Sequence, residues 1–174
     1  TAVFYHIPDL HDFIDGLRSV MSERTVFLTQ CVYMKDVLDK LQFDHFYHEH
    51  TMMHAITPLK RAFESHGMRL LDVDFYDVHG GSFVLTVGLE NCIHETSESV
   101  ERTIRAEKDF GLEDFETYLR FTREVEKNRD ELVSLLRDLK EQGKQVFALG
   151  APLKGSTLLN YCGIGPDLVE LATE

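Results

Sequence analysis

Two β-rich segments joined by a pair of glycines set the strongest constraint on how this 174-residue chain can fold. The segments at 68–78 and 82–90 read MRLLDVDFYDV and SFVLTVGLE, and they are separated by His79, Gly80 and Gly81. Glycine adopts the positive φ angles of a tight connection at no steric cost. The sequence therefore predicts an antiparallel pair of strands.

Helical and β-rich segments alternate ahead of this hairpin. Apolar residues at helical spacing predict a helix over about 9–22, with Asp9 as its N-cap. The segment TVFLTQCVY at 25–33 is nearly continuous in apolar character, which is typical of a strand buried on both faces. A short helix is predicted over 34–41, and the histidine-rich stretch after it has no clear period and predicts a loop.

The next helix carries start and stop signals that agree. Thr57 is the predicted N-cap, Pro58 the predicted first helical residue, and Gly67 the predicted end.

The region from 95 to 142 is highly charged and periodic. Within it, apolar residues recur every seven positions in one long helix, which predicts a packing stripe made of Tyr118, Val125, Leu132 and Leu139. The segment 144–150 then predicts a buried strand, and 151–163 predicts a turn into a helix.

This order of elements favours an α/β layered fold over a helical bundle or a β-sandwich. We expect residues 1–94 to form the closing half of an α/β sheet around an active-site loop. Residues 95–142 are expected to form a long helical connector, and residues 143–174 to begin a second α/β domain.

The overall charge argues against several partners. The formal net charge is −12, and no run of basic residues is present, which disfavours nucleic acid as a partner. No apolar stretch approaches the roughly 20 residues that span a bilayer, and no signal-peptide pattern occurs, so we expect no membrane partner and a cytoplasmic location. The three cysteines lie far apart and are expected to be reduced, buried thiols.

The stretch FDHFYHEH at 43–50 admits three interpretations. In the first, His48, His50 and His54 bind a metal, although HEHTMMH lacks the spacing of the H-E-x-x-H motif. In the second, Tyr47, Glu49 and His50 form an acid/base centre, because a near-neutral imidazole takes up a proton and its polar neighbours orient it. In the third, these histidines have no chemical role, and their ring nitrogens are hydrogen-bonded either to solvent or to residues of the core.

Four motifs carry a resemblance to a known family. They are HIPDL at 6–10, QFDHFYHEH at 42–50, HGGS at 79–82 and GAPLKGSTLLNYCGI at 150–164. Together, in this order, they resemble the S-adenosylmethionine-dependent C-methyltransferases that act on nucleotide-linked deoxysugars. The resemblance implies that the first sheet is the closing half of a Rossmann-like methyltransferase sheet.

The resemblance also implies a reaction and roles for four residues. A base removes the proton beside the 4-keto group of a nucleotide-diphosphate sugar, and the enolate attacks the methyl group of S-adenosylmethionine. His50 would be the base, and Tyr47 and Glu49 would surround the sugar. His6 would line the same pocket near the methyl donor.

The turn GAPLKGST follows a predicted strand and opens a helix, so its N–H groups and Lys154 are candidates to hold a phosphate. It differs from a P-loop because Lys154 precedes the second glycine. An ordinary strand-to-helix turn is the alternative. By resemblance the candidates for nucleotide-sugar binding are Lys154, Gly155, Ser156, Thr157 and Asn160, with weaker candidates at Gly80, Gly81 and Ser82, where a hairpin turn alone explains the glycines.

Two features of the family are missing from the sequence. It contains no cysteine cluster for the family's zinc module, and no glycine-rich turn follows a strand before residue 79. We therefore expect either part of a longer methyltransferase, too small to hold S-adenosylmethionine by itself, or a catalytically silent nucleotide-sugar-binding or oligomerisation module. Unpaired sheet edges also predict a homo-oligomer.

Overall fold

The computed structural model describes residues 3–150 and 152–173, which divide into two compact units. Unit 1 comprises Thr1–Lys40 and Glu49–Phe115, and unit 2 comprises Leu41–His48 and Glu116–Glu174. The histidine-rich stretch therefore contributes residues to both units. We describe each unit by itself.

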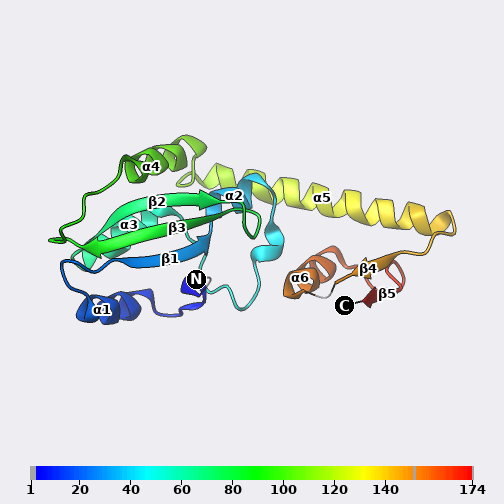
Figure 1. The fold of residues 1–174 in the computed structure, drawn as a ribbon. Coiled ribbons are helices and arrows are strands. Elements are labelled where there is room, and N and C mark those ends of the chain that lie inside the picture. Colours follow the sequence, from blue (N-terminus) through cyan, green and yellow to red (C-terminus); the bar gives the residue numbers. More distant parts are fainter. Residues whose placement is uncertain (1–2, 151, 174) are drawn as a thin grey trace. The chain divides into compact units, whose positions relative to one another are not determined.

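Unit 1 is built on a three-stranded sheet with the order β1-β3-β2 (Figure 1). The strands are β1 (Phe27–Val32), β2 (Met68–Tyr76) and β3 (Ser82–Leu89), and β3 pairs antiparallel with both neighbours. The predicted hairpin and the predicted α/β fold class are thus confirmed. Whether the outer strands pair with another copy of the chain stays a prediction.

Strand β1 is buried on one face, but its other face is open at Leu28 and buried only at its end, at Val32, so the prediction of burial on both faces was wrong for most of the strand. Cys31 is fully buried, whereas the side chain of Leu28 is 58% exposed. Successive side chains of a strand point to opposite faces of the sheet, and at Leu28 the described residues leave the second face open. An apolar run alone does not tell these two situations apart.

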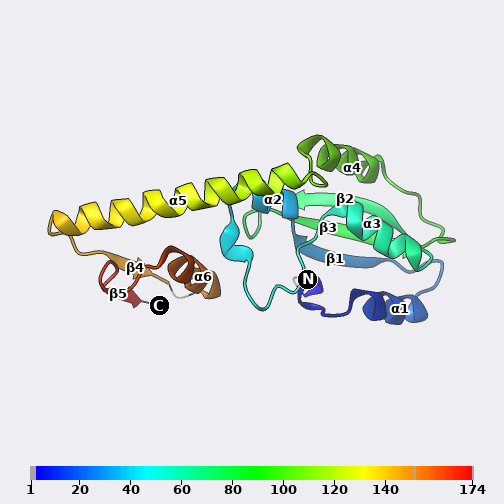
Figure 2. The ribbon, with the colours of Figure 1, turned by 180° about the vertical axis from the view of Figure 1, so that it is seen from behind.

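Helices complete unit 1. They are α1 (Leu10–Val20), α2 (Met34–Asp39), α3 (Ile56–Ser65) and α4 (Glu98–Phe110), preceded by the short 3-10 helix η1 (Phe4–His6). Figure 2 shows α3 lying in front of the strands, and the core between helices and sheet includes Ile14, Phe63, Phe83 and Leu85, all fully buried. Burial of this apolar surface is the main force that holds the unit together.

The start of α3 corrects one prediction. The N-cap is Ala55, and Thr57 lies inside the first turn without acting as a side-chain cap. The missing cap comes from α4, where the buried carboxylate of Glu107 accepts the backbone N–H groups of Ile56 at 2.6 Å and Thr57 at 2.8 Å. A carboxylate at this position also interacts favourably with the positive end of the helix dipole. The cap predicted at Asp9 is confirmed, because its side chain accepts the N–H of Asp12.

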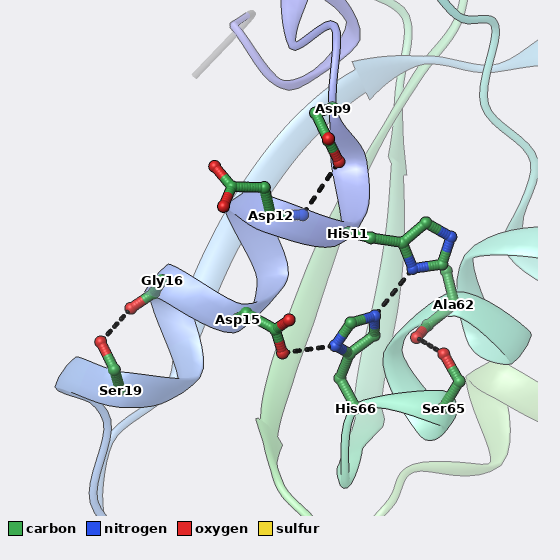
Figure 3. A network of polar contacts seen from close by, with 9 residues as sticks. All are labelled: Asp9, His11, Asp12, Asp15, Gly16, Ser19, Ala62, Ser65 and His66. Atoms are coloured by element: carbon green, nitrogen blue, oxygen red, sulfur yellow. Dashed lines mark hydrogen bonds and ion pairs between the residues drawn. The ribbon is translucent and has the colours of Figure 1, made fainter.

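A chain of three polar side chains joins α1 to the end of α3 (Figure 3). The Nδ1 atom of His66 lies 2.6 Å from a carboxylate oxygen of Asp15, and the Nε2 atom of His66 lies 2.7 Å from Nδ1 of His11. The Nδ1–H group of His66 donates a hydrogen bond to the carboxylate, and one ring nitrogen donates to the other in the contact between His66 and His11. This network fixes α1 against the C-terminal end of α3.

Unit 2 contains a long helix and a small α/β element. The elements are η2 (Phe43–His45), α5 (Phe115–Glu141), β4 (Phe147–Leu149), α6 (Leu153–Cys162) and β5 (Leu171–Thr173), and β4 pairs parallel with β5. The long helix that was predicted around the seven-residue stripe is confirmed. Its residues Val125 and Leu132 pack with Phe43 and Cys162 in a small apolar cluster.

The burial predicted for the strand at 144–150 was wrong. Phe147 is 57% exposed and Leu149 is 92% exposed. The described residues leave this two-stranded parallel sheet largely uncovered, so its apolar side chains remain accessible.

Within the described ranges, no helix combines the length and the apolar character that crossing a membrane requires. The three cysteines are free and buried, as the sequence predicted. Burial raises the pKa of the Cys31 thiol to about 12, which keeps it protonated and unreactive.

Candidate active site

Three aromatic rings from two distant segments meet in unit 1. Tyr5 and His6 lie in η1, and His50 lies in the loop that leads to α3. The ring centroids of Tyr5 and His50 are 4.6 Å apart, those of Tyr5 and His6 are 4.6 Å apart, and those of His6 and His50 are 5.4 Å apart. The structure therefore brings together two of the predicted site residues, His6 and His50.

The orientation of the His6 ring follows from one hydrogen bond. Its Nδ1 atom lies 2.6 Å from the backbone carbonyl oxygen of Glu49. A carbonyl oxygen only accepts, so Nδ1 of His6 carries the proton, and Nε2 is the basic nitrogen of the neutral ring. The ring of His50 is half-buried, and its Nδ1 atom is shielded from solvent.

Thr51 joins the two segments that carry these rings. Its backbone N–H donates to the carbonyl of Tyr5 at 3.0 Å. Its hydroxyl lies 3.0 Å from the carbonyl oxygen of Tyr5 and 3.1 Å from that of Ile7. These contacts, with the His6 bond, fasten η1 to the loop on both sides of His50. The sequence contained the threonine but no signal of this contact.

Glu49 and Tyr47 stand differently with respect to this site. Glu49 contributes its backbone carbonyl, while its side chain is exposed. Tyr47 and His48 belong to unit 2. The predicted convergence of Tyr47 and Glu49 on a sugar therefore stays a prediction.

His54 lies in the core of unit 1. It is 4% exposed, its ring centroid is 5.0 Å from that of Phe4, and it forms a hydrogen bond with the backbone of Phe4. Burial lowers its pKa from 6.5 to about 4, so the ring is neutral at physiological pH. In the ranges 3–150 and 152–173 no three histidine, cysteine or acidic side chains gather as metal ligands, so the metal interpretation of His48, His50 and His54 has no cluster to support it.

The HGGS turn is held by contacts within unit 1. The Lys40 ammonium donates to the Gly80 carbonyl at 2.8 Å and to the Asp36 carboxylate at 2.9 Å, and this Asp36 bond is the main reason that the pKa of Lys40 is raised. The Ser82 hydroxyl donates to the Val78 carbonyl at 2.8 Å. A Cβ atom added to Gly81 would clash with the Asp36 carboxylate. These contacts explain the glycine and the serine as parts of the turn.

A surface cavity of about 320 Å³ lies beside this turn, and Asp36, Lys40, Phe75, Tyr76, Asp77, Gly81 and Ser82 line it. The substrate-binding role predicted for Gly80, Gly81 and Ser82 stays a prediction.

The predicted phosphate-binding residues occupy the first turns of α6 in unit 2. Ser156 and Asn160 are exposed, and Gly155 and Thr157 are half-buried. Thr157 also lines a cavity of about 290 Å³, which is bordered by Phe43, Phe46, Phe121, Thr122, Val125 and Tyr161.

Lys154 has a partner that the sequence did not predict. Its ammonium lies 2.7 Å from Nε2 of His45, a residue 109 positions away that is only 2% exposed. The sequence interpretation assigned no role to His45. Its place in the FDHFYHEH stretch was the only available hint.

Comparisons with known proteins assign the chain to a family. The family model described as the C-methyltransferase C-terminal domain matches residues 77–174, so the chain belongs to this family of C-methyltransferases. The chain is also 34% identical over 171 residues to the C-methyltransferase NovU of Streptomyces niveus. This match covers 98% of the chain and 41% of NovU, so the chain spans well under half the length of that relative.

Proposed function

We propose that this chain carries the proton-abstracting and sugar-facing part of an S-adenosylmethionine-dependent C-methyltransferase that acts on a nucleotide-diphosphate 4-keto-deoxysugar. The observation that carries the proposal is the pairing of His6 and His50, whose ring centroids are 5.4 Å apart. Membership of the C-methyltransferase family supports the reaction class.

The chemistry that these residues support is deprotonation beside a ketone. The neutral His50 ring takes the proton from the carbon next to the carbonyl group, and the electron pair of the broken C–H bond forms the enolate. Because Nδ1 of His50 is shielded from solvent, we assign the proton transfer to Nε2. His6, with its Nδ1 proton committed to the Glu49 carbonyl, offers a second basic nitrogen beside the first.

The described residues do not fit a binding site for the methyl donor. The glycines ahead of the hairpin are Gly16, inside α1, and Gly67, after α3, so no glycine-rich turn follows a strand in that part of the chain. S-adenosylmethionine supplies an electrophilic methyl group in methyl transfer, and we derive no step through it from these residues. This observation favours a second candidate function, a catalytically silent module that binds the nucleotide-sugar.

Hydrogen exchange separates the two functions. The full chain is incubated in D₂O with a nucleotide-linked 4-keto-deoxysugar, and proton NMR follows the signal of the hydrogen beside the ketone. We expect this signal to decay faster than in buffer alone, because deprotonation does not need the methyl donor. Binding of the sugar without any acceleration would favour the silent module. Calorimetric titration with S-adenosylmethionine then shows whether the chain holds the donor by itself.

A further inference from the structure

The contact between His45 and Lys154 brings together two motifs of unit 2 that lie far apart in the sequence. His45 ends η2, Lys154 lies in the first turn of α6, and Nε2 and Nζ are 2.7 Å apart. The ring of Phe43, in the same short helix as His45, lies 5.1 Å from the ring of Tyr161 in α6. The histidine is therefore fixed by packing against the helix that carries the lysine.

The direction of this hydrogen bond follows from the chemistry of the two groups. An ammonium has three donors and no acceptor, so His45 must accept at Nε2 while Lys154 is charged. The His45 imidazole is then neutral, because both nitrogens of an imidazolium carry a proton and neither could accept a hydrogen bond from the ammonium. Partial burial lowers the pKa of Lys154 from its ordinary value, and the nearby charge of Asp44 opposes this effect.

A neutral imidazole as the partner of Lys154 leaves the charge of the lysine able to attract an anion, which a carboxylate partner would not. No carboxylate of the described residues forms an ion pair with Lys154. The neutral imidazole accepts one of the three N–H donors without cancelling the positive charge, which only the nearby charge of Asp44 offsets in part. A carboxylate would hold the amine as firmly but would compete with any anion for its charge.

The start of α6 supplies a second positive feature. The N-cap residue Pro152 makes no side-chain hydrogen bond to the first turn of this ten-residue helix, where the N–H of Gly155 donates to the Pro152 carbonyl. Such a terminus attracts anions through its N–H groups and its dipole.

We infer that His45 is a positioning residue, which holds the Lys154 ammonium beside the start of α6 so that it binds the phosphate groups of a nucleoside-diphosphate ligand. The inference rests on the proposed function and goes further, because it gives a role to a buried histidine outside the acid/base centre. The chemistry recognised is that of a diphosphate, whichever sugar or base it carries.

Inorganic pyrophosphate is a suitable probe, titrated calorimetrically into the full-length chain and its variants. We expect Lys154→Met to abolish binding and His45→Leu to weaken it roughly tenfold, the loss expected when one charge-assisted hydrogen bond is removed. His45→Gln, whose amide oxygen can accept the same bond, should restore most of the affinity. His45→Glu should weaken binding even though the lysine keeps a partner, because the carboxylate neutralises it.

Two controls separate a positioning role from a merely structural one. His48→Leu, an exposed position in the same stretch, should leave pyrophosphate binding and the melting temperature unchanged. NMR titration of the Lys154 side chain should show its pKa falling in His45→Leu and recovering in His45→Gln, because only these variants differ in the acceptor.

The results also distinguish this inference from the proposed function. Binding that is lost in Lys154→Met but unchanged in His45→Leu would overturn the role of His45 and leave the proposed function standing. Absence of pyrophosphate binding by the unmodified chain would overturn the inference, while the deuterium exchange near His50 would still report on the acid/base centre.

Discussion

The Nδ1 atom of His6 lies 2.6 Å from the carbonyl oxygen of Glu49, the residue immediately before His50. These two residues are 43 positions apart, and each belongs to one of the motifs on which the family resemblance rests. The bond fixes which nitrogen of His6 is basic and ties its position to the backbone beside His50. The positions of the two imidazoles are therefore linked through the backbone, and we expect a change that loosens this junction to affect both rings.

The Thr51 hydroxyl offers a direct test of that junction. Thr51→Val keeps the shape of the side chain and removes the hydrogen bonds to the carbonyls of Tyr5 and Ile7. We expect the free energy of unfolding to fall by about 1 kcal/mol. Deuterium exchange beside the ketone should slow as well, because the two rings lose their fixed relation.

Thr51→Ser is the matched control, since it keeps the hydroxyl and loses only a methyl group. Urea denaturation and the exchange assay should place it close to the unmodified chain. Equal behaviour of the valine and serine variants would mean that the hydroxyl does not hold the site.

Burial of His54 predicts acid sensitivity. Its pKa is lowered from 6.5 to about 4 in the folded chain, so the unfolded chain binds a proton that the folded chain excludes. Stability from the neutral ring is fully present above pH 6.5 and is lost as the pH falls from 6.5 toward 4. The loss amounts to about 3 kcal/mol at most.

Urea denaturation at a series of pH values measures this effect. His54→Asn keeps a donor for the Phe4 carbonyl but does not titrate, so its stability should depend less steeply on pH over that window. His48→Asn, at an exposed position, should retain the full dependence. Identical slopes for His54→Asn and the unmodified chain would exclude His54 as the source.

The Glu107 cap predicts a large effect from a small change. Glu107→Gln replaces one accepting oxygen with an NH₂ group, which turns a donor toward the N–H of Ile56 or Thr57. We expect a loss of about 2–3 kcal/mol, because a buried charged hydrogen bond is replaced by two opposed donors. Thermal unfolding followed by circular dichroism measures the loss. Glu101→Gln, on the exposed side of α4, should cost less than about 0.5 kcal/mol, and equal effects of the two changes would refute the cap.

Gly81 should be intolerant of any side chain. A Cβ atom there would lie 2.8 Å from Cβ of Asp36, whose carboxylate Lys40 holds, and the φ angle of 133° is itself unfavourable for other residues. We expect Gly81→Ala to destabilise the chain by more than about 2 kcal/mol.

Gly143→Ala separates the two causes in the same thermal melts. Gly143 has a φ of 71° with no atom within 4 Å of an added Cβ, so its variant should show only backbone strain, about 1 kcal/mol. If Gly81→Ala were no worse than Gly143→Ala, steric contact with Asp36 would not matter.

Local patterns predicted the elements well, and tertiary contacts account for what they missed. The hairpin followed from two β-rich segments and the paired glycines between them, and the end of α3 from Gly67, because both depend on neighbouring residues. The cap of α3 was not predicted, because Glu107 lies about fifty residues away in the sequence, whereas Thr57 is a typical capping residue at the expected start of the helix. The exposure of Leu28 and Leu149 depends on which elements cover each strand, which an apolar run does not encode.

In the candidate site, too, part of the arrangement was predicted from the sequence and part depends on tertiary contacts. The motifs indicated that His6 and His50 belong to one pocket, and the structure brings their rings together. The pairing of His45 with Lys154 spans 109 positions and left no trace in spacing or composition. Only the packing of η2 against α6 in the structure shows that the buried His45 accepts a hydrogen bond from Lys154.

The central claim is that the His50 imidazole removes the proton beside the sugar ketone. The most direct measurement is the rate of deuterium incorporation at that carbon, compared between the unmodified chain, His50→Asn and the exposed control His48→Asn. The account predicts a fall of about 100-fold for His50→Asn, with no loss of sugar binding, and an unchanged rate for His48→Asn. An undiminished rate in a folded His50→Asn variant would contradict it.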